Sequence, residues 1–156
     1  MGNSKRSENQ NESQVSSKMN FAGLYEVRDY KPSDESFVLS TFLRGLYHGD
    51  SWFSKIPKDI FMDNYHIIAE RLVRSPNVTI KIACLPDDPD VILGYSILSA
   101  DYSAMHWVYV KKIWRGKGIG RSLTPTRLEA VTHLSSLGES LLKAKLKDTV
   151  FNPFKI

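Results

Sequence analysis

A glycine-rich loop between a β-type segment and a helical pattern constrains this chain more than any other feature. Residues 105–110 are rich in β-branched and aromatic side chains, and three glycines follow at alternate positions of residues 116–120. Glycine adopts positive φ readily and lets a ligand approach the backbone closely. At the start of a helix, such a loop gathers backbone N–H groups on one concave surface, which suits a diphosphate. The sequence therefore predicts a phosphate-binding loop, to which Arg115 and Lys117 add positive charge.

The glycine spacing excludes two familiar kinds of phosphate loop. A P-loop needs Gly-x-x-x-x-Gly-Lys-Ser/Thr, but no glycine lies five residues before Gly116, and Lys117 is followed by another glycine. Rossmann and kinase loops need Gly-x-Gly-x-x-Gly, but Arg121 stands at the last glycine position. The spacing that remains is Arg-x-x-Gly-x-Gly, formed by Arg115, Gly118 and Gly120.

This spacing resembles motif A of the GNAT superfamily of N-acetyltransferases, whose loop holds the pyrophosphate of acetyl-CoA. Family members usually carry a valine five residues before the arginine, an aromatic residue just before it, and a leucine soon after the last glycine. Val110, Trp114 and Leu123 occupy these positions. The resemblance implies an α/β fold with a mixed, mostly antiparallel central sheet flanked by helices, over roughly residues 24–152. A glycine-rich hairpin turn on a basic surface is the alternative interpretation.

Length and composition fit one globular domain. The 156 residues suffice for a single core; residues 1–20 are nearly all polar and are expected to be disordered, whereas residues 21–156 would form the domain. One cysteine, Cys84, excludes an internal disulfide and suits a reducing compartment. Neither a membrane-spanning apolar run nor a secretory signal is recognised, so we expect a cytoplasmic protein, in the host cytoplasm if the chain is phage-encoded.

Hydrophobic periodicity predicts the order strand, helix, helix, three strands, helix, strand. Gly94 predicts a bulge or a close backbone approach, and Pro125 predicts a kink in the last helix. The expected elements are a strand at 25–28, a helix capped by Ser33, a helix beginning at Pro57, strands at 78–85, 91–98 and 105–110, a helix at 118–137 capped by Gly138, and a strand at 142–147.

This order resembles the GNAT fold only as far as its fifth strand. Family enzymes usually continue with another helix, which often supplies an asparagine that contacts CoA and a tyrosine that protonates the leaving thiolate. Here Pro153 follows Asn152 close to the chain end, and no tyrosine follows Tyr109. The resemblance therefore indicates a short form truncated after the fifth strand. The fifth strand would then form an edge of the sheet with unpaired backbone groups, which its lysines, the chain end or dimerisation would shield.

Acetyl transfer to an amine needs a base, an oxyanion donor and an acid. In the family, the oxyanion donor is a backbone N–H of the fourth strand, here that of Val108 or Tyr109, and Val110 would pair with the pantetheine arm. His106 is the candidate base because an ordinary histidine pKa near 6.5 suits proton removal at neutral pH. The alternative is a structural histidine of the strand, whose imidazole forms its hydrogen bonds with a neighbouring residue. Asp101 is a second candidate base, and Tyr109 and Tyr95 are candidate acids.

Binding residues follow from the resemblance. The expected acetyl-CoA contacts are Val108, Tyr109, Val110, Arg115, Gly116, Lys117, Gly118, Ile119, Gly120 and Arg121. The amine would meet the loop between the first two helices, at Tyr47, His48, Asp50, Trp52 and Phe53, unless these form a packed surface loop. His66 and His133 lie in helical patterns without a partner at metal-ligand spacing, so we predict no metal.

Three functions remain open at this point. The first is N-acetyl transfer from acetyl-CoA to an amine, with a homodimer through the fifth strand as an expected assembly. The second is an acyl-CoA-binding or structural protein that has lost catalysis with the missing helix. The third is a phage nucleic-acid-modifying protein, because the net charge is +4 and Lys143, Lys145 and Lys147 alternate along the expected last strand.

Overall fold

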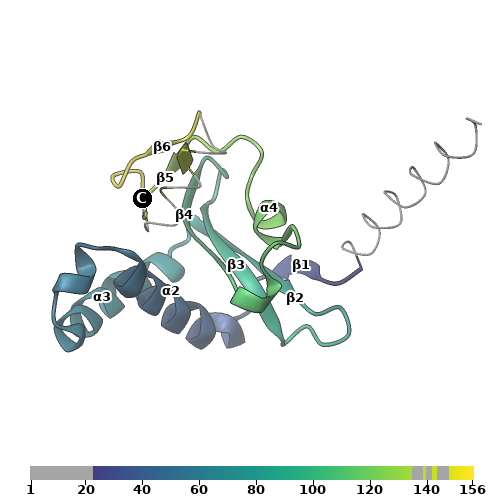
Figure 1. Cartoon of the computed structure of the whole chain (residues 1–156). Coiled ribbons are helices and arrows are strands. Elements are labelled where there is room, and N and C mark those ends of the chain that lie inside the picture. The colour runs from purple at the N-terminus through teal and green to yellow at the C-terminus, as the bar shows by residue number, and fades with distance from the viewer. Residues whose placement is uncertain (1–22, 135–138, 140–141, 144–147) are drawn as a thin grey trace, which may run out of the picture.

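The computed structural model describes residues 23–134, 139, 142–143 and 148–156. The segment predicted to be disordered, residues 1–20, lies outside them. In the described part of the chain, six strands form one sheet in chain order (Figure 1). The strands are β1 (Glu26–Asp29), β2 (Val78–Cys84), β3 (Ile92–Ser99), β4 (Ala104–Val110), β5 (Ala130–Val131) and β6 (Val150–Phe151). The α-helices are α2 (Glu35–Gly49), α3 (Lys58–Val73) and α4 (Ile119–Leu123), joined by 3-10 turns η1 (Pro32–Asp34), η2 (Phe53–Lys55) and η3 (Lys112–Trp114).

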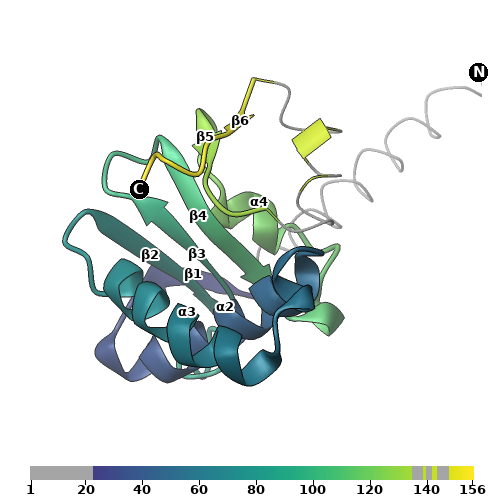
Figure 2. The same ribbon diagram turned by 90° about the vertical axis from the view of Figure 1, so that its left-hand side faces the viewer.

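The sheet is mixed, with helices on both faces. Strands β1 to β4 pair antiparallel, whereas β4, β5 and β6 pair parallel. Helices α2 and α3 cover one face, and α4 lies on the other (Figure 2). The alternation of strand side chains explains this arrangement: Ile80 and Ile82 join the core beneath α2 and α3, while Ala83 packs with α4. The predicted α/β class and the mostly antiparallel sheet are confirmed.

Gly94 lies at a β-bulge and also at a close backbone approach, the two alternatives that the sequence predicted for it. In the β2–β3 ladder, Ala83 pairs with Gly94 and Cys84 with Ile92, so one residue of β3 is extra. A Cβ on Gly94 would lie only 2.5 Å from the carbonyl oxygen of Tyr109. The absence of a side chain therefore lets β3 lie against the end of β4 at this point.

The start of α2 differs from the expectation of a Ser33 cap. Asp34 is the N-cap residue of α2, but its side chain forms no cap hydrogen bond to that helix. Its Oδ2 instead accepts the Lys31 N–H at 2.8 Å at the start of η1, and its two oxygens receive a bidentate ion pair from Arg28 at 2.8 and 2.9 Å. Burial opposes ionisation of the Asp34 carboxyl, but these bonds outweigh it and hold its pKa below the usual value. A carboxylate is favoured over the Ser33 hydroxyl at this place because it accepts hydrogen bonds from both a backbone N–H and the Arg28 guanidinium of β1.

The helix expected at 118–137 is much shorter in the structure. Helix α4 ends at Leu123, and Thr124 is extended with φ −104° and ψ 127°. A residue before proline is pushed out of the helical region, so Pro125 ends the helix where a kink was predicted. The chain then enters β5 inside the range assigned to the helix. The predicted cap, Gly138, lies outside the described residues.

The strand expected at 142–147 is also wrong at its beginning, since Leu142 and Lys143 are helical. Lys143 forms an ion pair with Glu139 at 3.2 Å, the i,i+4 spacing of a helix. Residues 144–147, with two of the three alternating lysines, lie outside the described part. The last described strand is instead β6, which pairs with β5. A short alternation of apolar and lysine residues fits either state, and this local pairing favours the helix.

Candidate active site

The second half of β4 has one edge that β5 does not pair. The Lys111 N–H donates to the Leu93 carbonyl at 2.8 Å, which makes Gly94 and Val110 a non-hydrogen-bonded pair of the antiparallel ladder. By the same alternation, the backbone N–H and carbonyl groups of Val108 and Val110 point away from β3. On that side, β5 pairs only with Ala104 and Met105. The described strands thus leave a polar backbone edge along residues 106–110.

His106 is a bulged residue within this strand. Leu98 pairs with Met105 and Ile97 with Trp107, so His106 has no partner in β3. Its side chain is 2% exposed, and its Nδ1 lies 2.8 Å from Thr132 Oγ1. Burial lowers the pKa of the imidazole below its usual value. The histidine is therefore neutral at pH 7, which suits a base.

The glycine-rich loop begins where β4 ends. Gly116 and Gly118 have φ of +79° and +84°, the left-handed region that favours glycine. No described residue accepts a backbone hydrogen bond from the N–H groups of residues 116–121. The loop thus presents consecutive unpaired donors with no Cβ at three of its positions. Those properties fit an anionic diphosphate.

Tyr25 fixes this loop from a distant part of the sequence. Its hydroxyl lies 2.6 Å from Ser122 Oγ and donates to the Gly118 carbonyl at 3.3 Å. The hydroxyl of Ser122 also donates to the same carbonyl at 3.1 Å. Sequence reasoning missed this role, because Tyr25 lies 93 residues from Gly118 and no local pattern relates the two.

The charged side chains around the loop differ in their contacts and in their exposure to solvent. Arg115 turns back toward the strand, and its Nε donates to the Val110 carbonyl at 3.0 Å. That carbonyl keeps a second lone pair, and the Val110 N–H remains unpaired by β3. Lys117 lies with its Nζ 5.9 Å from the Trp114 ring centre, and Arg121 is exposed. Ile119 is buried, whereas Gly120 lies beside Val110 and so brings the loop next to the end of β4.

The loop between α2 and α3 is largely held by its own contacts. The Tyr47 hydroxyl donates to the Ile56 carbonyl at 2.8 Å. Asp50 Oδ1 accepts the backbone N–H groups of Trp52 and Phe53 at 2.7 and 3.0 Å. Asp50 therefore caps the η2 turn. Trp52 is 67% exposed, which leaves its indole ring accessible to a ligand.

Two further aromatic residues of this loop form ring contacts, although His48 is exposed. His48 lies edge-on to the Tyr47 ring, with 5.1 Å between ring centres, and Phe53 packs against Phe61 and Tyr65 of α3 at 5.3 Å each. Of the five residues predicted to meet the amine, His48 and Trp52 are thus exposed, whereas Tyr47, Asp50 and Phe53 are partly buried. The packed-loop interpretation describes Tyr47, Asp50 and Phe53 well.

A hydrogen-bonded chain connects this loop region to β4. The Tyr65 hydroxyl lies 2.8 Å from His133 Nε2, and His133 Nδ1 lies 2.9 Å from Thr132 Oγ1, which reaches His106. The sequence interpretation of His133 as an ordinary helix residue was wrong, since it follows β5 and is not helical. Burial and the neighbouring His106 lower the pKa of His133 to about 4, and burial raises the pKa of Tyr65 to about 12.

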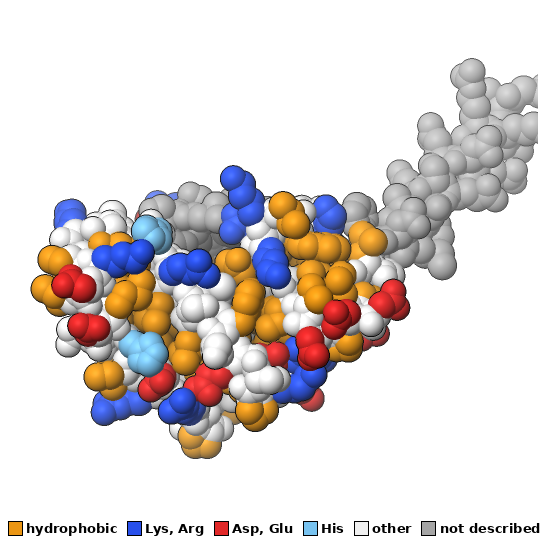
Figure 3. All heavy atoms as spheres, turned by 90° about the horizontal axis from the view of Figure 1, so that it is seen from below, with side chains coloured by type: hydrophobic (Ala, Val, Ile, Leu, Met, Phe, Trp, Pro, Cys, Tyr) orange, Lys and Arg blue, Asp and Glu red, His pale blue; other side chains and the backbone are white. Residues whose placement is uncertain are grey.

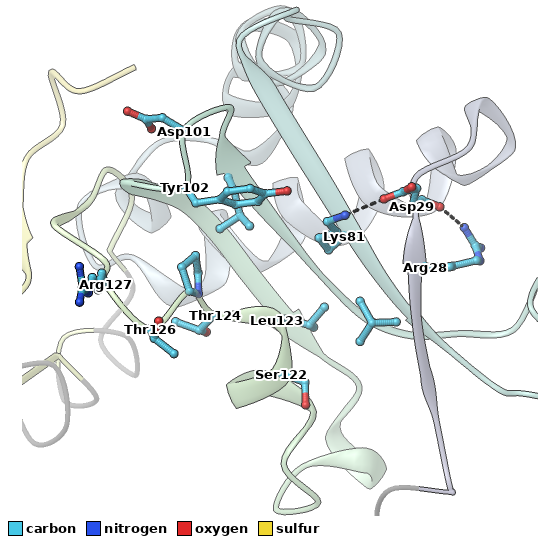
Figure 4. Close-up of a pocket in the computed structure, with 13 residues that line it drawn as sticks. Arg28, Asp29, Lys81, Asp101, Tyr102, Ser122, Leu123, Thr124, Thr126 and Arg127 are labelled. Carbon is cyan, nitrogen blue, oxygen red and sulfur yellow. Dashed lines mark hydrogen bonds and ion pairs between the residues drawn. The ribbon is translucent and has the colours of Figure 1, made fainter.

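Asp101, the second candidate base, has a structural role in the β3–β4 turn. Its Oδ1 accepts hydrogen bonds from the Ser99 hydroxyl and from the N–H and hydroxyl of Ser103, which lower its pKa to about 2. It lines an open pocket of about 730 Å³ between the sheet and residues 122–127, where Lys81 and Asp29 form an ion pair at 2.6 Å (Figure 4). Neither His106 nor the glycine-rich loop lines this pocket.

The described residues were expected to hold no metal and no membrane span, and their side chains and helices bear on both. No three histidine, cysteine or acidic side chains among them come together as a metal site. None of the described helices has the length and apolarity to cross a bilayer. On the face shown in Figure 3, described side chains of both charges are interspersed with hydrophobic ones.

Known family models and curated proteins give no match to this sequence. Solved structures do match. A candidate acetyl transferase from Pyrococcus furiosus has a TM-score of 0.52 and 16% identity, over 82% of this chain and 80% of its own. A candidate acetyltransferase from Clostridium difficile 630 has a TM-score of 0.51 and 11% identity, over 85% of this chain and 95% of its own. The chain shares the α/β fold of these two structures. At these identities, the similarity concerns the fold alone.

Proposed function

We propose that the protein is an N-acetyltransferase that moves an acetyl group from acetyl-CoA to an amine. The observation that carries the proposal is the continuity between the unpaired edge of β4 and the glycine-rich loop. An extended ligand with a diphosphate at one end fits such a surface, because strand edges and unpaired loop amides bind those two groups. The acetyltransferase fold of the similar solved structures supports the same activity.

The residues present fit acetyl-CoA at three points. The N–H groups of residues 116–121 would hold the diphosphate, with the exposed Arg121 and the half-buried Lys117 nearby. The Val110 N–H would pair with the pantetheine arm. The Val108 N–H, on the same edge, would stabilise the oxyanion of the thioester carbonyl. When bound, acetyl-CoA supplies the activated acetyl group, and the chain's own groups orient it.

Within this proposal, His106 removes a proton from the attacking ammonium. It lies four residues before Val110 on the same strand, and no described residue forms a hydrogen bond with its Nε2. The acid for the leaving thiolate is either His106, once it has taken up the ammonium proton, or Tyr109. The Tyr109 hydroxyl has no hydrogen-bond partner among the described residues, although its ring packs against Tyr95 and Phe37. The exposed Trp52 would contact the amine substrate.

Two measurements test the proposal together. Calorimetric titration with acetyl-CoA measures binding, and a free-thiol assay measures CoA release with panels of polyamines, peptides and aminoglycosides. We expect saturable binding and amine-dependent thiol release. Absence of acetyl-CoA binding would exclude the proposed function.

The second candidate is acyl-CoA binding without catalysis. It is favoured by the burial of His106, which is 2% exposed, and by the packing of Tyr109 in the aromatic cluster beneath α2. Binding of acetyl-CoA without thiol release from any amine would support this candidate.

The other partner predictions remain proposals. Val150 and Phe151 of the edge strand β6 are 59% and 49% exposed, so a second copy could pair there. Light scattering would report such a dimer. The cytoplasmic location and the phage source remain predictions from the sequence.

A further inference from the structure

Four side chains from three distant segments form one uninterrupted hydrogen-bonded chain. Tyr65 comes from α3, His133 and Thr132 follow β5, and His106 lies in β4. His106 and Thr132 are 2% and 3% exposed, whereas Tyr65 and His133 are half-buried. The chain therefore runs from a buried imidazole on β4 to a phenol nearer the surface.

We propose that Tyr65, His133 and Thr132 form a proton relay for His106, which exchanges protons between the acetyl-transfer site and water. The proposal rests on the proposed function for the identity of the reaction. The three relay residues are positioning residues, because they act on the substrate only through His106.

Counting hydrogens gives two complete patterns along the chain. In the first, the Tyr65 hydroxyl donates to His133 Nε2, His133 Nδ1–H donates to Thr132, and the Thr132 hydroxyl donates to His106 Nδ1. The remaining imidazole proton of His106 is then on Nε2. In the second pattern, every bond is reversed: His106 Nδ1–H donates to Thr132, Thr132 to His133 Nδ1, and His133 Nε2–H to Tyr65. His106 Nε2 then carries a lone pair.

The resting pattern follows from the donor that each pattern leaves outside the chain, since both contain three internal hydrogen bonds. The first pattern leaves the Nε2–H of His106 without a described partner, at a residue that is only 2% exposed. The second pattern leaves the hydroxyl proton of the half-buried Tyr65, which lies nearer to water. A buried donor without a partner is the more unfavourable of the two. The second pattern, with the proton on His106 Nδ1 and a lone pair on Nε2, is therefore the resting one.

Each pattern suits one half of acetyl transfer. In the first, His106 gives its Nε2 proton to the departing thiolate, each relay proton moves one place toward His106, and Tyr65 takes a proton from water. The second pattern results. In that state, His106 Nε2 takes a proton from the next substrate ammonium, the relay protons move back, and Tyr65 releases one proton to water.

Protons balance over the cycle. The uptake and the release at Tyr65 cancel, and the acylated nitrogen gives its surplus proton to water. The sum is one ammonium and one acetyl thioester converted to one amide, one thiol and one proton. The relay thus lets a buried histidine act as both acid and base without holding a charge in the interior, where burial disfavours the imidazolium.

Nuclear magnetic resonance of the ligand-free protein tests the relay without reference to activity. Long-range ¹H–¹⁵N correlations report which imidazole nitrogen carries the proton, and the chain has only four histidines to assign. We expect wild-type His106 protonated at Nδ1 and His133 at Nε2. Tyr65→Phe keeps the ring that stacks on Phe61 at 5.2 Å but removes the hydroxyl. It should shift the tautomer population of His106, although Tyr65 does not touch His106.

Thr132 supplies the matched set of variants. Thr132→Val cuts the relay and should abolish the response of His106 to Tyr65→Phe, whereas Thr132→Ser keeps a hydroxyl and should restore it. Thr41→Val removes another buried hydroxyl, bonded to Tyr95 at 2.8 Å, outside the relay. It should leave the His106 nitrogen signals unchanged. Unchanged His106 signals in Tyr65→Phe, with Thr132 intact, would overturn the relay.

Turnover separates this proposal from the proposed function. With an active amine, Tyr65→Phe and Thr132→Val should lower the rate of thiol release about tenfold with unchanged acetyl-CoA affinity, and Thr132→Ser should recover most of it. If Tyr65→Phe keeps the full rate, the relay carries no catalytic proton and the proposal fails. If the tautomers respond as expected but wild-type protein transfers no acetyl group, the hydrogen-bonded coupling stands and the acetyltransferase assignment fails.

Discussion

Gly45 of α2 lies directly against the indole ring of Trp107 on β4. A Cβ added to Gly45 would lie 2.9 Å from Cζ2 of that ring, closer than real Cβ contacts allow. Phe42, one turn earlier on α2, packs on the same indole with 5.3 Å between ring centres. The helix can therefore approach the sheet next to His106 only because residue 45 has no side chain.

Gly45→Ala should destabilise the protein, even though alanine is the better helix former by about 1 kcal/mol. Overpacking against a rigid ring costs about 1–3 kcal/mol, so we expect a net loss of about 1 kcal/mol in the free energy of unfolding. Urea denaturation measures it. Ser40→Ala, at an exposed position of the same helix, is the control and should change stability little. A stabilised Gly45→Ala protein would show that α2 can move away from the sheet freely.

Gly118→Val should weaken acetyl-CoA binding by about 2 kcal/mol or more, roughly 30-fold in affinity. The reason is a φ of +84° together with a Cβ and methyl groups placed where the diphosphate approaches. Calorimetric titration gives the affinity, and circular dichroism checks the fold. Gly118→Asn separates the two causes, because asparagine tolerates positive φ but still adds a side chain. Wild-type affinity in both variants would remove the glycine-rich loop from the binding site.

Tyr25→Phe should lower acetyl-CoA affinity about fivefold, because the lost hydroxyl no longer holds Gly118 and Ser122 together. The midpoint of thermal unfolding should change little, since this contact is exposed to solvent. Ser122→Ala removes the other partner of the pair. In calorimetry, the double variant should bind no more weakly than the stronger of the two single effects, as expected for one shared interaction. Fully additive losses would argue for two independent contacts.

Acid should destabilise the fold between about pH 6.5 and pH 4. The pKa of His133 is about 4 in the folded protein, below the usual value, so in this window the unfolded chain binds a proton that the folded chain does not. The free energy of unfolding therefore falls as the pH falls, by about 2 kcal/mol from this residue. Urea denaturation at pH 7 and pH 4.5 measures the loss.

His133→Gln is the matched variant for this titration, because glutamine keeps hydrogen-bonding capacity without a titrating group. Its loss of stability over the same window should be smaller than that of the wild type. The lowered pKa values of Asp34 and Asp101 weaken the fold only at lower pH, near and below their ordinary value of 3.8. An equal loss in the wild type and in His133→Gln would assign the acid sensitivity to other groups.

His106→Ala should leave acetyl-CoA affinity unchanged and lower turnover by about 10²-fold or more, if His106 is the general base. The wild-type rate should rise with pH and level off below neutrality, since burial lowers the pKa of this histidine. His66→Ala, on α3 with a half-exposed side chain, is the control and should keep the wild-type rate. A wild type with measurable transfer that His106→Ala leaves untouched would assign proton removal to water or to another group.

Local patterns in the sequence predicted the elements that local physics controls. Strands β2, β3 and β4 were expected from β-branched alternation, and α3 from its apolar spacing after Pro57. The glycine-rich loop was recognised from the spacing of its glycines. A positive φ such as that of Gly118 is a local backbone conformation that glycine adopts readily, so the sequence alone can indicate it. The limits of local patterns appear at the end of α4, where the effect of Pro125 was underestimated, and at Leu142, where a short alternation fitted both strand and helix.

The tertiary structure alone decided which distant side chains meet. Tyr25 lies beside Gly118, and Tyr65 reaches His106 through His133 and Thr132, although 68 residues separate Tyr65 from His133. No spacing rule relates such residues, since sheet order and helix packing bring them together only after the chain has folded. The sequence by itself determined a strand, a loop and a helix start that suit a diphosphate. Folding determined the surroundings of His106, because burial and hydrogen-bond partners are properties of the assembled core.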